Sequence, residues 1–301
     1  MRDFVIFGEC LVELSHDAQG QLKQGFAGDV YSVSVYLKRA CPEARVRLLC
    51  ALGDDPFSQS LRTELAEEGV DTSFLLTHPQ RHVGLYSIHN DDNGERSFIY
   101  WRSESAARHT LRLLEEQGQN LLDNPPDCFY LSGISLAVAE AETSGAIWPL
   151  LEGLVERSTR IVFDTNYRPT LWADEASAQS AFDRVLGYSS LVLPGVEDMQ
   201  MLYGFKTTEA IGNYLQQFDV PEMVLKDGPA DILYGQPTSP DRFPISPVKT
   251  VVDTTAAGDS FSGTLLGELA RGGSLVQAIA SGAAMSARVI QFPGAILPRQ
   301  D

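Results

Sequence analysis

A run of small and polar residues near the carboxyl end of the chain, Asp253–Gly263 (DTTAAGDSFSG), has the composition of an anion-binding helix start. Small side chains let backbone N–H groups approach an anion closely, and the positive end of the helix dipole adds to the attraction. Asp259, in the first turn of that helix, would lie beside the anion and accept the proton of a hydroxyl that attacks a phosphoryl group. The same pattern also fits an ordinary helix N-cap in a tight turn. This segment alone therefore leaves phosphoryl transfer and a plain helix start equally open.

Other chemistry has less support in the sequence. The five histidines have no metal-ligand spacing, and the four cysteines have no Cys-x-x-Cys spacing, so a zinc site is not expected. No Gly-x-x-x-x-Gly-Lys-Ser/Thr occurs, which excludes a P-loop kinase. The absence of Gly-x-Gly-x-x-Gly removes the best support for a dinucleotide-binding dehydrogenase.

Short apolar runs bounded by turn residues recur along the chain, as expected of buried strands. They are Phe4–Phe7, Val46–Ala51, Phe129–Leu131, Ile161–Phe163, Leu191–Leu193 and Met223–Leu225. Helix-length segments lie between several of them, at Pro56–Glu68, Ala176–Leu186 and Thr208–Phe218. This alternation predicts an α/β fold with a parallel sheet covered by helices on both faces.

The early part of the chain has a different pattern. Gly84–His89 and Arg96–Trp101 are strand-like and flank Asn90–Gly94, which ends in a hairpin-forming Asn-Gly. Leu11–Ser15 and Gln21–Phe26 are a second antiparallel candidate. We therefore predict a small β-structure inserted in one domain that spans residues 1–301, without repeats or linkers. Near the other end, the Ala- and Ser-rich segment at 272–287 is predicted to form a buried helix.

The charge balance limits the partners. With 23 Lys and Arg against 40 Asp and Glu, the formal charge is −17 and the pI is near 4.6, which argues against nucleic acid or an anionic membrane as partner. An anionic substrate would need a local cluster of positive groups. The chain shows no signal-peptide pattern and no apolar run of spanning length, and its scattered cysteines suit a reducing compartment. We predict a cytoplasmic protein.

Several blocks of the sequence together resemble the PfkB/ribokinase family of carbohydrate kinases, and within it the kinases of 2-keto-3-deoxygluconate. The blocks are Gly8–Ser15, Gly25–Asp29, Ala51–Phe57, Gly94–Arg96, Tyr100–Ala107, Leu131–Leu136, Phe163–Trp172 and Asp253–Phe261. They occur in the family's order over nearly the whole chain, so together they are far more specific than any one of them.

The resemblance implies a Rossmann-like three-layer αβα fold of the ribokinase type, with a small β-lid formed from about residues 11–27 and 84–102. It implies transfer of a phosphoryl group from ATP to the primary 6-hydroxyl of 2-keto-3-deoxygluconate. In such kinases the aspartate that matches Asp259 is the base. The backbone of Ala256, Ala257 and Gly258 matches the anion hole, and Arg168 matches an arginine near the phosphate path.

The remaining site residues follow from the same resemblance. Sugar hydroxyls are expected at Gly28, Asp29 and Ser32, and the nucleotide at Asn166, Lys226, Asp227 and Gly228. Planar recognition of a carboxylate favours arginine, so Arg102 and Arg168 are candidates for the sugar acid. Arg102 follows an aromatic pair in an apolar strand and therefore needs a partner. Tyr86 and Tyr100 offer hydroxyls and flat faces, although each also fits a packed strand position.

The chain departs from the family pattern at three places. Ala27-Gly28 stands for a glycine pair, Ser32 for an asparagine, and Gly195-x-x-Asp198 for Asn-x-x-Glu. The last change bears on Asp198, the candidate for the magnesium network, which usually works through water. A fructokinase or another sugar kinase of the same family remains an alternative, and acceptance of 2-keto-3-deoxygalactonate remains open. A catalytically silent protein that binds a sugar or nucleotide as a sensor is a further alternative. The sequence also leaves open whether a monovalent cation supports the anion hole, and the family favours a homodimer or a larger homo-oligomer.

Overall fold

A nine-stranded sheet forms the centre of the computed structural model, which describes residues 1–16, 19–90, 96–141 and 145–299. In spatial order the strands are β13 (Asp241–Phe243), β12 (Ile232–Gly235), β11 (Met223–Leu225), β10 (Leu191–Leu193), β9 (Arg160–Asp164), β8 (Cys128–Ser132), β1 (Asp3–Phe7), β4 (Arg45–Leu52) and β5 (Leu75–Thr77). All six expected strands are present, and the neighbours from β11 to β5 pair in parallel.

Two strands that the sequence did not predict extend the parallel sheet at one edge. Strand β12 pairs antiparallel with β11, and β13 pairs antiparallel with β12. The connection from Leu225 to Ile232 is too short for a crossover helix, so the chain can only turn back beside the strand it has just left.

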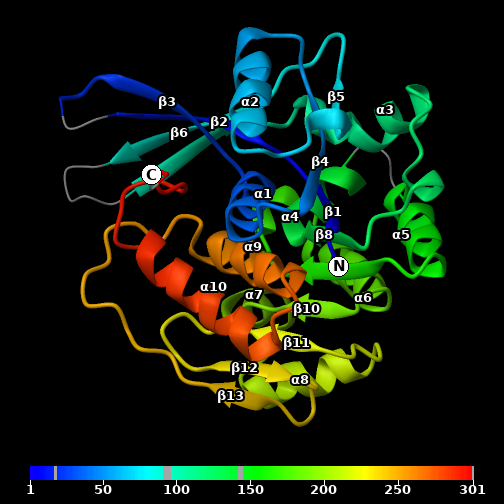
Figure 1. Cartoon of the computed structure of the whole chain (residues 1–301), viewed down its shortest axis with the longest axis vertical. Coiled ribbons are helices and arrows are strands. Elements are labelled where there is room, and N and C mark those ends of the chain that lie inside the picture. Colours follow the sequence, from blue (N-terminus) through cyan, green and yellow to red (C-terminus); the bar gives the residue numbers. More distant parts are fainter. Residues whose placement is uncertain (17–18, 91–95, 142–144, 300–301) are drawn as a thin grey trace.

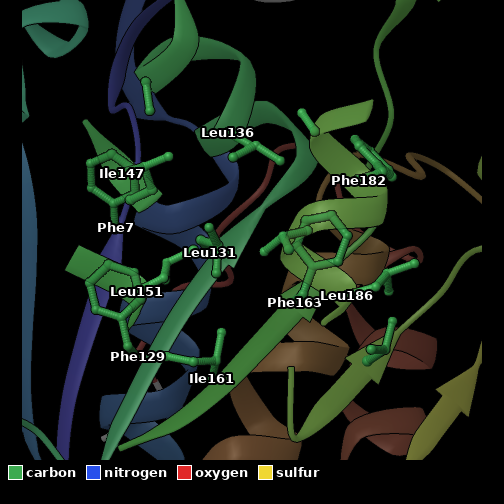
Figure 2. Close-up of a cluster of buried hydrophobic side chains, with 14 of the residues drawn as sticks. Phe7, Phe129, Leu131, Leu136, Ile147, Leu151, Ile161, Phe163, Phe182 and Leu186 are labelled. Carbon is green, nitrogen blue, oxygen red and sulfur yellow. The ribbon is translucent and has the colours of Figure 1, made fainter. Parts of the chain in front are cut away.

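Helices cover both faces of the sheet (Figure 1). One face carries α1 (Asp29–Ala40), α2 (Pro56–Glu67), α9 (Ala257–Ala270) and α10 (Leu275–Val289); the other carries α3 (Thr110–Glu116), α5 (Ile147–Glu156), α6 (Glu175–Leu186), α7 (Val196–Tyr203) and α8 (Thr208–Gln216). Alternation along β1 divides its side chains between the two cores: Phe4 and Ile6 pack on the first face, and Val5 and Phe7 on the second. Figure 2 shows the second core, where Phe129 and Phe163 meet residues from the covering helices. This is the predicted three-layer α/β architecture.

Helix α9 packs directly against α1. A Cβ built on Gly263 would come within 2.6 Å of the Val33 carbonyl oxygen, and one on Gly267 within 2.5 Å of the Ala40 Cβ. The two glycines therefore let the helices approach, and this aligns the first turns of both. The outer helix α10 is not the buried helix that its composition predicted. It packs on α9 through one face, so only four of its residues (Ala278, Ile279, Gly282 and Val289) are buried.

A separate four-stranded sheet projects from one side of the molecule (Figure 1). Its order is β3 (Leu22–Ala27), β2 (Leu11–His16), β6 (Gly84–Asn90) and β7 (Arg96–Trp101). Both expected antiparallel pairs are present, and β2 joins them by pairing in parallel with β6. The expected hairpin loop lies, apart from Asn90, outside the described residues. Within the described part of the chain, no helix has the length and apolar character needed to cross a bilayer.

Candidate active site

Four charged side chains meet where strands of the large sheet end and helices begin. Asp164 ends β9 and Lys226 follows β11, while Asp29 and Asp259 occupy the first turns of α1 and α9. In open α/β sheets, the carboxyl ends of the strands and the adjoining helix starts form the ligand-binding edge. The topology thus gathers residues from widely separated parts of the sequence at one place.

Asp164 and Lys226 form the centre of this cluster. The Lys226 Nζ donates to both carboxylate oxygens of Asp164, at 3.0 and 2.8 Å. Ser262, one turn after Asp259 on α9, donates its hydroxyl to the same carboxylate at 2.8 Å. A Cβ built on Gly258 would lie 3.8 Å from Lys226 Nζ. The ammonium group therefore lies between a buried carboxylate and the start of α9.

Asp259 is a half-buried carboxyl group surrounded by charges of both signs. Burial and the neighbouring carboxylates of Asp29 and Asp164 raise its pKa to about 7, against the opposing effect of Lys226 and Arg168. A carboxylate with a pKa near the working pH is well suited to take a proton from a hydroxyl and hold it during the reaction.

The start of α9 presents backbone donors next to Asp259. Ala256, the N-cap residue, has a left-handed backbone conformation with φ 57°, and the first N–H groups of a helix have no acceptor within it. The Ala257 N–H donates to the Thr254 carbonyl oxygen at 3.2 Å. Of the three predicted anion-hole residues, Ala257 therefore already uses its N–H in a turn, and Gly258 is the most exposed.

Asp29 is the most buried carboxylate of the predicted sugar site. It accepts hydrogen bonds from the Ser132 hydroxyl and, at 3.3 Å, from Asn166 Nδ2. Burial raises the pKa of Asp29, while the Ser132 hydrogen bond and the charge of Arg102 lower it. Asn166, predicted to bind the nucleotide, thus contacts the carboxylate predicted to bind sugar, and its nucleotide role stays a prediction.

Asp198 lies one strand further along the sheet edge. Its Oδ2 accepts the Thr165 hydroxyl at 2.8 Å, and its Oδ1 is 3.7 Å from Arg168 Nη1. Burial raises the pKa of Asp198. Gly195 makes room for this carboxylate, because a Cβ there would come within 2.8 Å of Asp198 Oδ2. Thr165 and Gly195 together define the position of the Asp198 carboxylate.

The small sheet contributes an arginine that is already paired. Arg102 Nε donates to Glu9 Oε2 at 2.7 Å, and its Nη2 contacts the same oxygen. The partner that the sequence analysis expected for Arg102 is therefore a protein carboxylate, and the pair uses one edge of the guanidinium. Tyr100 is half exposed beside it, with its ring 5.9 Å from the guanidinium carbon.

Four other predicted residues are less accessible or more peripheral than the sequence suggested. Tyr86 is 6% exposed and donates its hydroxyl to Glu13, as the packed strand alternative expects. Ser32 is buried inside α1. Asp227 and Gly228 lie exposed in the turn after Lys226.

Several polar residues without a role predicted from the sequence also lie in the site. They are Glu9, Ser132, Asp164, Thr165 and Ser262. Ser132 and Asp164 end apolar strands, and Thr165 follows Asp164. A polar residue at the carboxyl end of a buried parallel strand is the signal that could have predicted these three.

Comparisons with known proteins show the family to which the chain belongs. The pfkB family carbohydrate kinase profile matches residues 1–301, and the chain belongs to this family. It is 35% identical to the 2-dehydro-3-deoxygluconokinase of Escherichia coli (strain K12) over 99% of this chain and 98% of that protein. The enzyme of that name from Dickeya dadantii (strain 3937) is 34% identical over 99% and 97%. A fructokinase of Salmonella typhimurium is less similar, at 27% over 89% and 84%.

Solved structures show the same fold. A PfkB protein from Polaromonas sp. JS666 superposes with a TM-score of 0.83 and 24% identity, over 97% of this chain and 96% of that one. A putative ribokinase II from E. coli in complex with ATP and Mg²⁺ gives a TM-score of 0.79 and 20% identity, over 98% and 94%. The ribokinase-type fold predicted from the sequence is confirmed.

Proposed function

We propose that this carbohydrate kinase phosphorylates the primary 6-hydroxyl of 2-keto-3-deoxygluconate (2-dehydro-3-deoxygluconate) with ATP. The observation that carries the proposal is Asp259, a carboxyl group of pKa about 7 held next to the exposed start of α9. The similarity to 2-dehydro-3-deoxygluconokinases over 99% of the chain supports the substrate, and the weaker similarity to a fructokinase makes fructose the second candidate.

In this mechanism, Asp259 accepts the proton of the attacking sugar hydroxyl. The N–H groups at the start of α9 and the Lys226 ammonium face the negative charge of the transferring phosphoryl group. Preorganised donors of this kind are typically worth about 3–4 kcal/mol each in the transition state. Asp164 and Ser262 hold Lys226 and the start of α9 in their relative positions.

Magnesium would be held chiefly by the ATP phosphates. Among the described residues, no group of three or more His, Cys, Asp or Glu side chains could hold a metal ion. Mg²⁺ commonly keeps several waters and binds one or two carboxylates together with substrate phosphates. The carboxylate of Asp198, with Arg168 and Thr165 beside it, fits such contact through water. The ion would neutralise phosphate charge, and the Arg168 guanidinium would lie near the path of the transferred phosphoryl group.

The sugar would lie between Asp29 and the small sheet, which we propose acts as the lid of a single kinase domain. Asp29 would accept hydrogen bonds from sugar hydroxyls at the start of α1. Arg168, whose side chain is 54% exposed, is the more accessible guanidinium for the sugar-acid carboxylate. Arg102 would offer only the edge that Glu9 leaves unused.

A kinase assay against a small panel tests the substrate. The panel contains 2-keto-3-deoxygluconate, 2-keto-3-deoxygalactonate and fructose, each with ATP and Mg²⁺, with and without K⁺. We expect the highest kcat/KM for 2-keto-3-deoxygluconate. A clear preference for fructose would overturn the sugar-acid assignment, and no turnover of any sugar would favour the silent sensor.

We further propose a homodimer that forms through the small sheet. Ile99 and Trp101 are two residues apart on its edge strand β7, so they lie on the same face, and they are 46% and 57% exposed. Large apolar side chains gathered in this way favour a protein partner. Sedimentation of the wild type and of Trp101→Lys tests this, with a monomeric wild type as the opposing result.

A cytoplasmic location stays a prediction; the four free cysteines and the use of ATP support it.

A further inference from the structure

Glu9 is a buried carboxylate that the proposed chemistry does not use. It lies between β1 and β2 and is 1% exposed. Its Oε2 accepts from Arg102 Nε at 2.7 Å, and its Oε1 accepts from the Ser105 hydroxyl. Both oxygens are therefore engaged, one by the end of the small sheet and the other by the segment that leads back into the body.

The chain passes between the body and the small sheet four times, and Glu9 is in contact with every passage. Glu9 itself lies in the first, just before β2. In the second, before α1, a Cβ on Gly28 would come within 2.5 Å of the Glu9 carbonyl oxygen. In the third, at the start of β6, a Cβ on Gly84 would come within 2.8 Å of Glu9 Oε1. Arg102 is in the fourth, just after β7.

Burial of this ion pair indicates a geometric role. The Arg102 and Glu9 side chains are 13% and 1% exposed, and the desolvation of two charges largely cancels their attraction. Such a pair adds little net stability but strongly favours one arrangement of the groups it joins. Arg102 lowers the pKa of Asp29 through its charge, so the arrangement extends to the predicted sugar site.

We propose that Glu9 is a positioning residue that fixes the small sheet on the body and orients Arg102 toward the sugar. Glu9 does not touch the reacting atoms. The inference rests on the proposed function, since it takes the space between Asp29 and the small sheet as the sugar site. It assigns to one carboxylate the geometry of the contact between Arg102 and the sugar, separately from phosphoryl transfer.

The test is Glu9→Gln, which preserves the shape and removes the charge. We expect the KM for 2-keto-3-deoxygluconate to rise about tenfold, with kcat and the KM for ATP unchanged within about twofold. A conservative Glu9→Asp should recover part of the loss. A lower kcat and a similar rise in both KM values, together with a lower Tm, would show a purely structural role. A sugar KM equal to that of the wild type would exclude the proposal.

Amide hydrogen exchange in the ligand-free protein gives a second readout that needs no activity. The Ser105 N–H donates to the Arg102 carbonyl oxygen at 3.2 Å, and the Ala106 N–H donates to the His82 carbonyl oxygen at 2.8 Å. Glu9→Gln should speed exchange at these two amides while β8 exchanges as in the wild type. Unchanged exchange would contradict the proposal. If the wild type does not turn over the sugar acid, the proposed function fails, and the exchange result still decides the role of Glu9.

A matched pair of glycine variants avoids changing any charge. A Cβ on Gly84 would press on Glu9, Leu11 and Arg102, whereas a Cβ on Gly25 in the same sheet has no atom within 4 Å. Gly84→Ala should therefore repeat the effect of Glu9→Gln on the sugar KM and on exchange, and Gly25→Ala should behave as the wild type. Equal behaviour of the two variants would argue against Glu9 as the point of contact.

Discussion

Asp164 and Lys226 form a buried ion pair across the sheet edge, although 62 residues separate them in the sequence. Their side chains are 5% and 19% exposed, and the same ammonium group lies beside Gly258 at the start of α9. One cation thus balances a structural carboxylate and lowers the pKa of Asp259, the proposed base. The pair links the stability of the sheet edge to the chemistry.

Lys226→Met should therefore affect stability and activity together. It leaves Asp164 as an unpaired buried carboxylate, which typically costs about 3–5 kcal/mol of the free energy of unfolding. The loss of the positive charge should also move the pH profile of kcat/KM to higher pH, because Lys226 lowers the pKa of Asp259. Urea unfolding and a pH series of kcat/KM measure the two effects.

The matched control is Lys206→Met, which removes an exposed lysine after α7. An exposed substitution of this kind should change the free energy of unfolding by less than about 0.5 kcal/mol. If Lys226→Met were as stable as this control, the ion pair would not have the role described here.

Asp259→Asn tests the base. An amide cannot accept the hydroxyl proton, and general base catalysis typically contributes about 100-fold or more. We expect kcat to fall by at least about 100-fold, with the KM for ATP changed by less than about threefold. Steady-state kinetics at saturating sugar measure this, and full turnover by the variant would refute the mechanism.

The raised pKa of Asp259 also predicts how stability depends on pH. Folding raises the pKa from its ordinary value of 3.8 to about 7, so between these values the folded state binds more protons than the unfolded state. The contribution of Asp259 to stability is therefore lost as the pH rises from about 4 to about 7. Asp259→Asn, which does not titrate, should gain Tm relative to the wild type from pH 5 to pH 8 in ligand-free protein. A constant difference between the two proteins would indicate an unshifted pKa.

Much of the fold could be predicted from the sequence because its signals are local. Buried parallel strands are short apolar runs, and Leu191–Leu193 was predicted although it is only three residues long. The antiparallel edge was missed because Ile232–Gly235 is half exposed and Asp241–Phe243 is short and polar. The position of α10 on the outside of α9 depends on tertiary packing, which its Ala- and Ser-rich composition does not encode.

The site was predictable only in part, for a related reason. Asp259 lies in a contiguous motif with a definite local geometry, so its position at a helix start could be read directly. Arg102 and Glu9 are 93 residues apart, and no local pattern shows that they pair. The need of Arg102 for a partner could be inferred, but the identity of the partner depends on how the small sheet joins the body.

Two substitutions at the start of α9 should change the free energy of unfolding in opposite directions. Ala256 has φ 57°, a region where a non-glycine residue costs about 1–2 kcal/mol. Ala256→Gly should therefore raise the free energy of unfolding by about 0.5–1 kcal/mol after the greater freedom of the unfolded chain is counted. Ala257→Gly, at the first helical residue, should lower it by about 0.5–1 kcal/mol. Urea unfolding of both variants tests the conformation, and the same sign for both would contradict it.

Gly195→Ala moves the Asp198 carboxylate without removing it. A Cβ at this position would come within 2.8 Å of Asp198 Oδ2, so the carboxylate must turn away from Thr165 and from its place near Arg168. If Asp198 supports magnesium through water, the apparent KM for Mg²⁺–ATP should rise about fivefold to tenfold, while the sugar KM is unchanged within about twofold. Gly187→Ala is the control, because its Cβ would meet the Arg184 carbonyl oxygen at an ordinary 3.5 Å. A titration of activity with Mg²⁺ at fixed ATP separates the two variants, and identical curves would remove Asp198 from the magnesium network.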